Sequence, residues 1–190
     1  MGWFEQDPEP SFRLIEECHL PENASILNVG SGASTMVEKL LTRGFQNIIA
    51  SDISSSALEL HKKSLGPDRS KNIQWIVDDL CEPKILQKLG PVDLWHDRAV
   101  LHFFQYPAQQ EAYFRLLKDL VKKDGFVIIA AFSLKGATQC SGLPVKRYSK
   151  EMLEESLGSA FHLQQTFDYT FTNPSGNTRE YIYTQFQRKV

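Results

Sequence analysis

The stretch from Ser25 to Ser34 constrains the fold of this chain more than any other. It reads Ser-Ile-Leu-Asn-Val-Gly-Ser-Gly-Ala-Ser, a short apolar run that enters two glycines and is followed by residues at helical spacing. Apolar residues such as Ile26 and Leu27 suit a parallel strand buried on both faces. Gly30 permits a sharp turn, and Gly32 lets a ligand approach the backbone. The pattern predicts an α/β sheet with a nucleotide-type pocket at its carboxyl edge. The alternative is an ordinary strand-to-helix turn.

The residue after this turn distinguishes two classes of ligand. A dinucleotide site favours a third small residue beneath the pyrophosphate, and this chain has Thr35 there. The stretch instead resembles the first motif of class I S-adenosylmethionine-dependent methyltransferases, in which a strand ends in an acidic residue, any residue, and Gly-x-Gly. The resemblance implies that Asn28, Gly30, Ser31 and Gly32 bind the cofactor. Asn28 departs from the family, because an amide accepts a hydrogen bond without bringing a negative charge.

The second predicted strand, residues 47–51, ends at Asp52. This residue follows Gly30 by 22 positions (52 minus 30). A carboxylate at that spacing accepts hydrogen bonds from both ribose hydroxyls in nucleotide-binding α/β sheets. We therefore expect Asp52, with its neighbour Ile53, to bind the cofactor. The alternative is that Asp52 only caps the helix expected from Ser55.

The third predicted strand, residues 73–77, is followed by two acids and a leucine. In the methyltransferases that the chain resembles, an acid just past this strand accepts from the adenine amino group, and the next residue's backbone contacts the ring. By position, Asp79 and Leu80 fit these roles better than Asp78. The alternative is an acid that caps the segment that follows.

The fourth predicted strand, residues 91–96, runs into Asp97-Arg98-Ala99-Val100-Leu101-His102-Phe103, where a helix is expected. A central strand does not end in polar residues unless these have partners. The stretch resembles a group of small bacterial methyltransferases with Trp-His-Asp-Arg-Ala-Val-x-His-Phe at this point, and thiopurine methyltransferases also carry Asp-Arg here. The resemblance covers nearly the whole chain, including Trp3-Phe4 and residues 140–148.

Four residues at this turn are candidates for chemistry. The Asp97 carbonyl is expected to accept from the cofactor's ammonium group, and Arg98 to bind its carboxylate or a substrate anion. His96 and His102 are candidate general bases, because imidazole titrates near neutral pH. The alternative is that Asp97 and Arg98 form a structural ion pair and that His102 lies on a helix face.

The remaining segments are expected to surround this site. Residues 1–22 predict a helix preceded by Trp3 and Phe4, which either pack on the flank or form a lid over the cofactor site. Apolar spacing predicts a helix over 108–123, ended by Asp124-Gly125, and an apolar strand over 126–132. The segment 133–148 is long for a loop and is expected on the substrate side, with Arg147 and Tyr148 as candidate substrate contacts.

Two alternating segments, 161–171 and 179–188, predict a terminal antiparallel hairpin. A hairpin after five β/α units matches the class I methyltransferase sheet. The resemblance therefore implies an α/β, doubly wound, seven-stranded and mostly parallel sheet of order 3-2-1-4-5-7-6. At 190 residues, the chain is expected to form one domain over 1–190.

Composition excludes several classes of function. The net charge of −2, with acids and bases interspersed, argues against a nucleic-acid surface. Three widely spaced cysteines predict no zinc or other metal site and a reducing compartment, so cytoplasm is expected. No apolar run is long enough to cross a membrane, and there is no signal pattern.

These observations predict an enzyme that transfers a methyl group from S-adenosylmethionine, leaving S-adenosylhomocysteine. A small molecule is the first expectation for the acceptor, and a protein side chain is the second; oligomeric state is not indicated. A non-catalytic cofactor-binding module remains an alternative, because Asn28 departs from the motif. A short oxidoreductase is disfavoured by Thr35 and by the lack of a Tyr-x-x-x-Lys pair.

Overall fold

The computed structural model describes residues 7–32, 34–173 and 176–190. One seven-stranded sheet runs through it in the order β3-β2-β1-β4-β5-β9-β8. Its strands are β1 (Ser25–Val29), β2 (Asn47–Asp52), β3 (Ile73–Val77), β4 (Val92–Arg98), β5 (Val121–Phe132), β8 (Phe161–Thr172) and β9 (Thr178–Arg188). The first five are parallel, and β9 runs antiparallel to both neighbours. The predicted doubly wound sheet and its order are confirmed.

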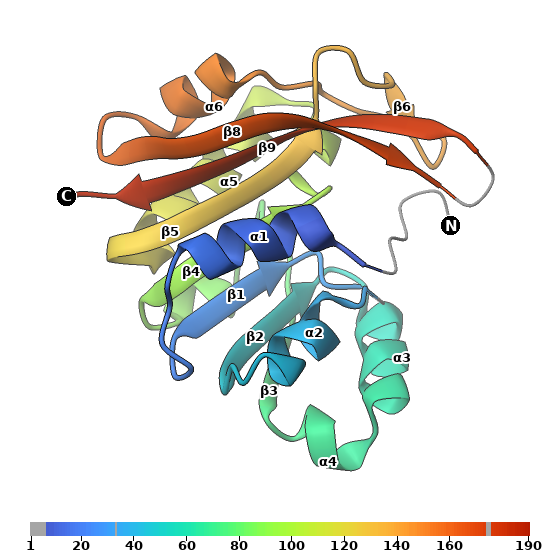
Figure 1. Cartoon of the computed structure of the whole chain (residues 1–190), viewed down its shortest axis with the longest axis vertical. Coiled ribbons are helices and arrows are strands. Elements are labelled where there is room, and N and C mark those ends of the chain that lie inside the picture. Colours follow the sequence, from blue (N-terminus) through green and yellow to red (C-terminus); the bar gives the residue numbers. More distant parts are fainter. Residues whose placement is uncertain (1–6, 33, 174–175) are drawn as a thin grey trace.

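Helices cover both faces of this sheet (Figure 1). They are α1 (Glu9–Glu17), α2 (Met36–Thr42), α3 (Ser55–Leu65), α4 (Pro67–Ser70), α5 (Pro107–Leu120) and α6 (Lys150–Leu157). Two 3₁₀ turns, η1 (Leu86–Lys88) and η2 (Leu101–Phe103), and a small hairpin of β6 (Gln139–Cys140) with β7 (Leu143–Pro144) complete the structure. No helix within the described ranges has both the length and the apolarity to span a membrane.

Alternate residues of the central strands pack into two separate cores. Leu27 of β1 and Trp95 of β4 point into one core with α5 and α6, whereas Ile26 and Leu94 point into the other with α1 and α2. All four side chains are fully buried. Side chains alternate across a strand, so a strand buried on both faces must be apolar at every position. This requirement explains the continuous apolar run that the sequence shows in β1.

Two features differ from the sequence predictions. The short helix α4 forms over Pro67–Ser70, for which no helix is predicted above. The helix expected to reach Lys123 ends at Leu120, because buried Val121 already pairs with Val92 of β4. Asp124 then adopts a φ of 63° inside β5, next to a register shift against β4. Residues 121–123, predicted as the last turn of the helix, are therefore the irregular start of β5.

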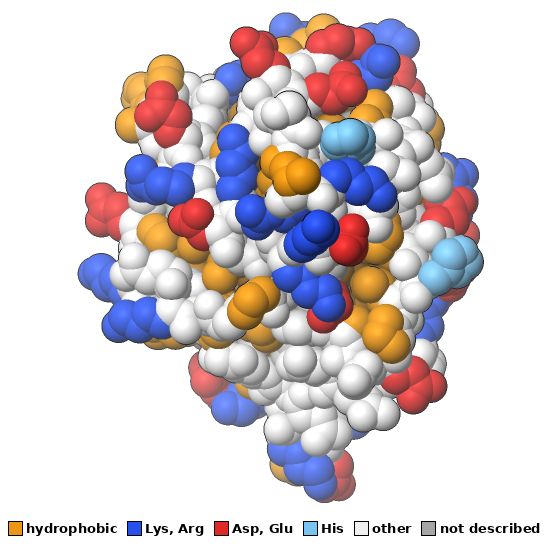
Figure 2. Space-filling model, turned by 90° about the vertical axis from the view of Figure 1, so that its left-hand side faces the viewer, with side chains coloured by type: hydrophobic (Ala, Val, Ile, Leu, Met, Phe, Trp, Pro, Cys, Tyr) orange, Lys and Arg blue, Asp and Glu red, His pale blue; other side chains and the backbone are white. Residues whose placement is uncertain are grey.

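The parallel strands all end on one side of the molecule. In Figure 1 the arrows of β1 and β5 point to the right, and Figure 2 shows the opposite face, where these strands begin. Basic and acidic side chains are mixed over that face. A ligand crevice in such a sheet lies outside the carboxyl ends of the strands. The functional site is therefore expected on the side that Figure 2 does not show.

A buried polar chain anchors β4 to α5. The Trp95 indole N–H donates to the Tyr113 hydroxyl at 3.1 Å, and this hydroxyl donates to Asp97 Oδ2 at 2.7 Å. All three residues are completely buried. Each polar group in the chain has a partner, as burial in a sheet interior requires. These hydrogen bonds fix the carboxyl end of β4 against α5.

We predict that Tyr113→Phe lowers the free energy of unfolding by about 1–3 kcal/mol, because it leaves the buried Trp95 N–H unpaired and removes a donor from Asp97. Urea denaturation measures the loss as a lower midpoint with an unchanged slope. Tyr106→Phe is the matched control, since Tyr106 is 70% exposed. A Tyr113→Phe midpoint equal to that of the control would contradict the proposed role of the hydroxyl.

Candidate active site

A cavity of about 570 Å³ opens at the carboxyl ends of β1 to β4. It is lined by residues from the turns that follow these strands, together with part of α3 and the β6–β7 hairpin: Gly30, Gly32, Asp52, Ile53, Ser56, Ala57, Leu60, Asp78, Asp79, Leu80, Arg98, Ala99, Val100, Phe103, Phe104, Cys140 and Ser141. Its wall is mostly apolar and carries a few carboxylates and a guanidinium. Such a wall is typical of a small-molecule or cofactor site.

The glycine turn after β1 forms the floor of this cavity. Gly30 and Gly32 have φ angles of 60° and 45°, as the predicted sharp turn requires. A Cβ atom at Gly30 would lie 2.0 Å from Cγ2 of Val100, so the two turns touch at a point where only glycine fits. Ser31 is buried within the turn and does not line the cavity. Its backbone N–H donates to the carbonyl of Ser51, which ties β1 to β2.

Asp52 lies at the cavity wall with both carboxylate oxygens hydrogen-bonded to backbone. Oδ2 accepts from the Gly32 N–H at 2.7 Å, and Oδ1 accepts from the Ser54 N–H at 2.8 Å. Ser54, rather than Asp52, caps α3, because its hydroxyl accepts from Ala57 N–H. The alternative of a helix cap is thus wrong. Asp52 joins the glycine turn to the second strand and retains lone pairs toward the cavity.

The two acids after β3 have different surroundings. Asp78 accepts from the backbone N–H groups of Asp79, Lys84, Ile85 and Leu86. Burial opposes ionisation of Asp78, but these hydrogen bonds outweigh it and lower its pKa. Asp79 accepts from the N–H of Cys81 at 2.8 Å. Asp79 therefore has more acceptor capacity left for a ligand, in line with the preference for Asp79 over Asp78.

Arg98 and Asp97 do not act as a pair. Within the described part of the chain, the donors to the Asp97 carboxylate are Tyr113 and the backbone N–H groups of Val100 and Leu101. Burial raises the pKa of Asp97 to about 6 against the opposite effect of these bonds. Arg98 lines the cavity, donates from Nε to the Tyr183 hydroxyl at 3.2 Å, and stands 5.5 Å from the ring centre of Tyr181.

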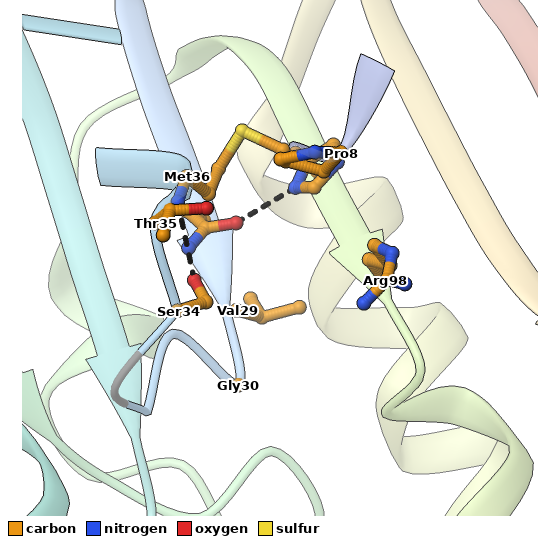
Figure 3. A pocket seen from close by; sticks show the side chains of 9 residues that line it. Pro8, Val29, Gly30, Ser34, Thr35, Met36 and Arg98 are labelled. Atoms are coloured by element: carbon orange, nitrogen blue, oxygen red, sulfur yellow. Dashed lines mark hydrogen bonds between the residues drawn. The ribbon is translucent and has the colours of Figure 1, made fainter. Parts of the chain in front are cut away.

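A second, smaller pocket of about 40 Å³ continues from the first, since Gly30 and Arg98 line both. Figure 3 shows Arg98 on one side and Ser34, Thr35 and Met36 on the other. The remaining lining residues are Pro8, Asn28, Val29 and His96. The two pockets together form an elongated site with a mostly apolar section and a smaller section of mixed polar and apolar lining.

The structure argues against His96 as a general base. His96 is 1% exposed, and its Nδ1 and Nε2 lie 2.7 Å from Asn28 Oδ1 and 3.0 Å from Ser11 Oγ. Burial, with a smaller effect from the charge of Arg98, lowers its pKa to about 3. Both ring nitrogens are occupied by neighbours inside the protein. The polar end of β4 thus has the buried partners that a central strand needs.

His102 is also not in a position to act as a general base, because it does not reach the surface of the cavity. It has no exposed surface, does not line either pocket, and stacks on Phe132 with ring centres 4.5 Å apart. Neither ring nitrogen has a hydrogen-bond partner among the described residues. Burial, then the charge of Arg98, lowers its pKa to about 3. His102 belongs to an aromatic cluster beneath the cavity rather than to its surface.

The two candidate substrate residues of the long loop lie outside the cavity lining. Tyr148 is 1% exposed and belongs to the core around α5 and α6. Arg147 donates to the backbone carbonyls of Leu134 and Gly136, so it braces its own loop. Cys140 and Ser141 are the residues of this loop that reach the cavity. Trp3 and Phe4 lie outside the described residues.

Several cavity residues were missed from sequence because a helix was expected directly after β4. Ala99 instead has a φ of 72°, and the chain reaches η2 only at Leu101. This path brings Val100, Phe103 and Phe104 to the cavity. Their position just past a central parallel strand was the available signal. The apolar side chains of α3 at Ala57 and Leu60 carried no such signal.

We predict that Gly30→Ala destabilises the protein by roughly 2–5 kcal/mol, because the added methyl group meets the stiff Val100 side chain and φ is positive. Adding Val100→Ala should restore the part of the unfolding free energy that is lost to the clash. A double-mutant cycle of unfolding free energies measures this recovery. Gly90→Ala is the control, since a Cβ there meets nothing within 4 Å. A Gly30→Ala variant as stable as the control would refute the contact.

We predict that His102→Phe makes stability less sensitive to acid. A histidine whose pKa is lower in the folded state contributes stability above the unfolded pKa of about 6.5, and this contribution is lost as pH falls toward 3. Between pH 7 and pH 5 the wild type should lose about 2 kcal/mol more than the variant. Chemical denaturation at both pH values measures this difference. Equal losses would show that His102 does not resist protonation.

Comparisons with known proteins agree with this geometry. A family model described as a methyltransferase domain matches residues 26–125, from β1 into β5. EEF1A lysine methyltransferase 2 of Danio rerio is 28% identical over 185 residues, covering 93% of this chain and 72% of its own length. The protein of the same name from Homo sapiens is 24% identical over the same share of this chain, again with 72% of its own length covered.

Solved structures share the fold. A methyltransferase from Anabaena variabilis superposes with a TM-score of 0.79 at 17% identity and covers 98% of this chain and 87% of its own. The 1,6-didemethyltoxoflavin-N1-methyltransferase of Burkholderia thailandensis, solved with its ligand and S-adenosylhomocysteine, gives 0.71 at 18% identity, with 96% and 78% covered. With the family model matching more than half of its residues, the chain belongs to the class I S-adenosylmethionine-dependent methyltransferases.

Proposed function

We propose that S-adenosylmethionine lies along the two connected pockets. The residues fit its parts: a larger apolar cavity with carboxylates at its wall suits an adenosine, and a small pocket with polar side chains suits an amino-acid tail. Asp52 would accept from the ribose hydroxyls, and Asp79 with Leu80 would contact the adenine. Ile53 and Val100 supply apolar wall. The glycine turn lets the cofactor approach the backbone where a Cβ atom cannot fit.

The protein's role in the reaction is binding and alignment. The bound cofactor supplies an electrophilic methyl group on its sulfonium, which the acceptor's nucleophile attacks in line. Asp97 and the Val100 and Leu101 N–H groups hold the turn after β4 in place. Phe103 and Phe104 then wall the cavity against water. A dedicated base is not needed for such a displacement when the nucleophile is neutral.

The acceptor in this proposal is a lysine side chain of a protein. The supporting observation is that the relatives named EEF1A lysine methyltransferase 2 align with 93% of the chain. The sequence alone favoured a small molecule. The relatives shift the preference, because an alignment of that length extends into the loop and hairpin regions beyond the residues matched by the family model.

The cavity can favour the reactive form of an amine. A lysine attacks only when its amine is neutral, and an apolar environment lowers an amine's pKa. Phe103, Phe104 and Val100 provide the apolar wall. The rim also exposes Ile53 and Leu60, which are 70% and 66% exposed. These apolar side chains offer a contact surface to a protein acceptor.

A small-molecule acceptor is the second candidate. It is supported by the fold neighbour whose name gives 1,6-didemethyltoxoflavin as its substrate. The same apolar wall would accommodate an aromatic ring, and Arg98 would bind an anionic group on it.

Incubation of the protein with methyl-labelled S-adenosylmethionine and a cell extract tests the acceptor class. We expect label in the retained protein fraction after dialysis, and loss of that label when the extract's lysines are first acetylated. Label transferred only to a dialysed small molecule that chromatography separates from S-adenosylmethionine would favour the second candidate. Label that stays entirely on S-adenosylmethionine, with cofactor binding intact, would favour a non-catalytic module.

We predict that Asp52→Ala weakens S-adenosylhomocysteine binding by about 1–3 kcal/mol, because a charged acceptor to the ribose is lost. Asp52→Asn, which keeps one carbonyl acceptor, should lose less. Asp68→Ala is the control, since that side chain is 97% exposed on α4. Isothermal calorimetry measures the three affinities. Asp52→Ala binding as tightly as the control would remove Asp52 from the cofactor site.

A further inference from the structure

Gly32 of the glycine turn is held through both of its backbone hydrogen-bonding groups. Its N–H donates to Asp52 Oδ2 at 2.7 Å, and its carbonyl oxygen lies 2.9 Å from Nδ1 of His61. The φ of Gly32 is 45°, and glycine adopts positive and negative φ with similar ease. The two hydrogen bonds therefore fix the most adaptable residue of the turn, at a point where the turn lines the cavity.

His61 is the donor of the second bond. A carbonyl oxygen only accepts hydrogen bonds, so Nδ1 carries the proton. Burial lowers the pKa of His61 and outweighs the opposite effects of the Gly32 carbonyl and of Glu38. The side chain is 4% exposed and lines neither pocket. At neutral pH it is therefore a buried, uncharged donor that reaches the turn without entering the cavity.

A residue of β3 orients the imidazole of His61. The ring meets that of Trp75 edge to face, with ring centres 5.3 Å apart and an interplanar angle of 73°. The Trp75 indole N–H donates to the carbonyl of Ser70 in α4 at 3.1 Å, which fixes this ring in turn. Figure 1 shows α3, which carries His61, beside β2 and β3. The short helix α4 is thus connected to the glycine turn through two side chains.

These contacts form a closed loop around the Asp52 carboxylate. Oδ1 accepts from the N–H of Ser54, the residue that caps α3. His61 follows on the same helix, about two turns later. It binds the carbonyl of Gly32, whose N–H returns to Oδ2 of Asp52. Both carboxylate oxygens are therefore oriented by one connected set of groups in the ligand-free protein.

We infer that His61 is a positioning residue for cofactor binding, which holds the Gly32 carbonyl and thereby presents the Asp52 carboxylate to the ribose. This inference rests on the cofactor placement proposed above. His61 itself does not contact the ligand in this arrangement. Its contribution is preorganisation, because a turn that is already ordered costs less free energy to immobilise when the ligand binds.

Calorimetric titration with S-adenosylhomocysteine tests this role. His61→Phe keeps a ring against Trp75 but removes the donor, and it should weaken binding roughly tenfold. His61→Asn places an amide N–H near the position of Nδ1 and should restore most of the affinity. Leu58→Ala is the matched control, since Leu58 is a buried residue of α3 that lines neither pocket. It should lower stability and leave the affinity within about twofold.

A double-mutant cycle with Asp52→Ala separates positioning from a general defect of the fold. Because His61 acts through Asp52, His61→Phe should weaken S-adenosylhomocysteine by less than about threefold when residue 52 is already alanine. Equal losses in both backgrounds would overturn the inference. An unchanged affinity of His61→Phe, or a loss of the same size in Leu58→Ala, would do so as well.

Hydrogen exchange of the Gly32 amide gives a readout without ligand. The ratio of its exchange rate to that of Leu27 in β1 should rise roughly tenfold in His61→Phe and should not rise in Leu58→Ala. An unchanged ratio in a protein that binds S-adenosylhomocysteine would reject the inference alone. A raised ratio in a protein whose wild type binds no S-adenosylhomocysteine would reject the cofactor site proposed above, and the role of His61 in binding with it. Should His61→Phe not fold, His61→Gln replaces it in both measurements, because its amide N–H lies farther along the side chain than Nδ1.

Discussion

The contact between Gly30 and Val100 is the constraint on which the site depends. It joins the turn after β1 to the turn after β4, at the point where the strand order of the sheet reverses. Without a side chain at position 30, the two turns meet and form a continuous floor, and the walls from β2 and β3 rise on one side of it. Any larger residue would clash with the Val100 side chain and force the two turns apart.

The polar end of β4 is compatible with a central strand because its polar side chains find hydrogen-bond partners on both faces of the sheet. Trp95 and Asp97 bond to Tyr113 on one face, whereas His96 bonds to Ser11 on the other. The side chains alternate, so neither face must accommodate all of the polarity. The two histidines differ in this respect. Both ring nitrogens of His96 have hydrogen-bond partners, whereas those of His102 have none among the described residues and its ring stacks on Phe132.

The sequence predicted the strands and the ends of β1 to β3, because apolar runs and glycine turns are local signals, whereas the strand order was implied by the resemblance to known methyltransferases. It also selected Asp52, Asp79 and Arg98, which the structure brings to one cavity. It could not reveal that His96 and His102 are buried, since a histidine's pKa depends on neighbours distant in the chain. The path from Ala99 to Phe103 was hidden for a different reason: a positive φ at alanine is a tertiary effect that no local propensity favours.

The hydrogen bonds of Asp78 have a consequence for how such an enzyme diversifies. One carboxylate holds the backbone from Asp79 to Leu86, so this side of the cavity is already rigid before a ligand arrives. Another part of the cavity lining, Cys140 and Ser141, belongs to the β6–β7 hairpin, a separate two-stranded unit outside the main sheet. Substitutions and length changes in that hairpin can alter acceptor choice without disturbing the cofactor wall. The cavity thus combines one wall that Asp78 holds rigid with another, from the β6–β7 hairpin, whose sequence can vary.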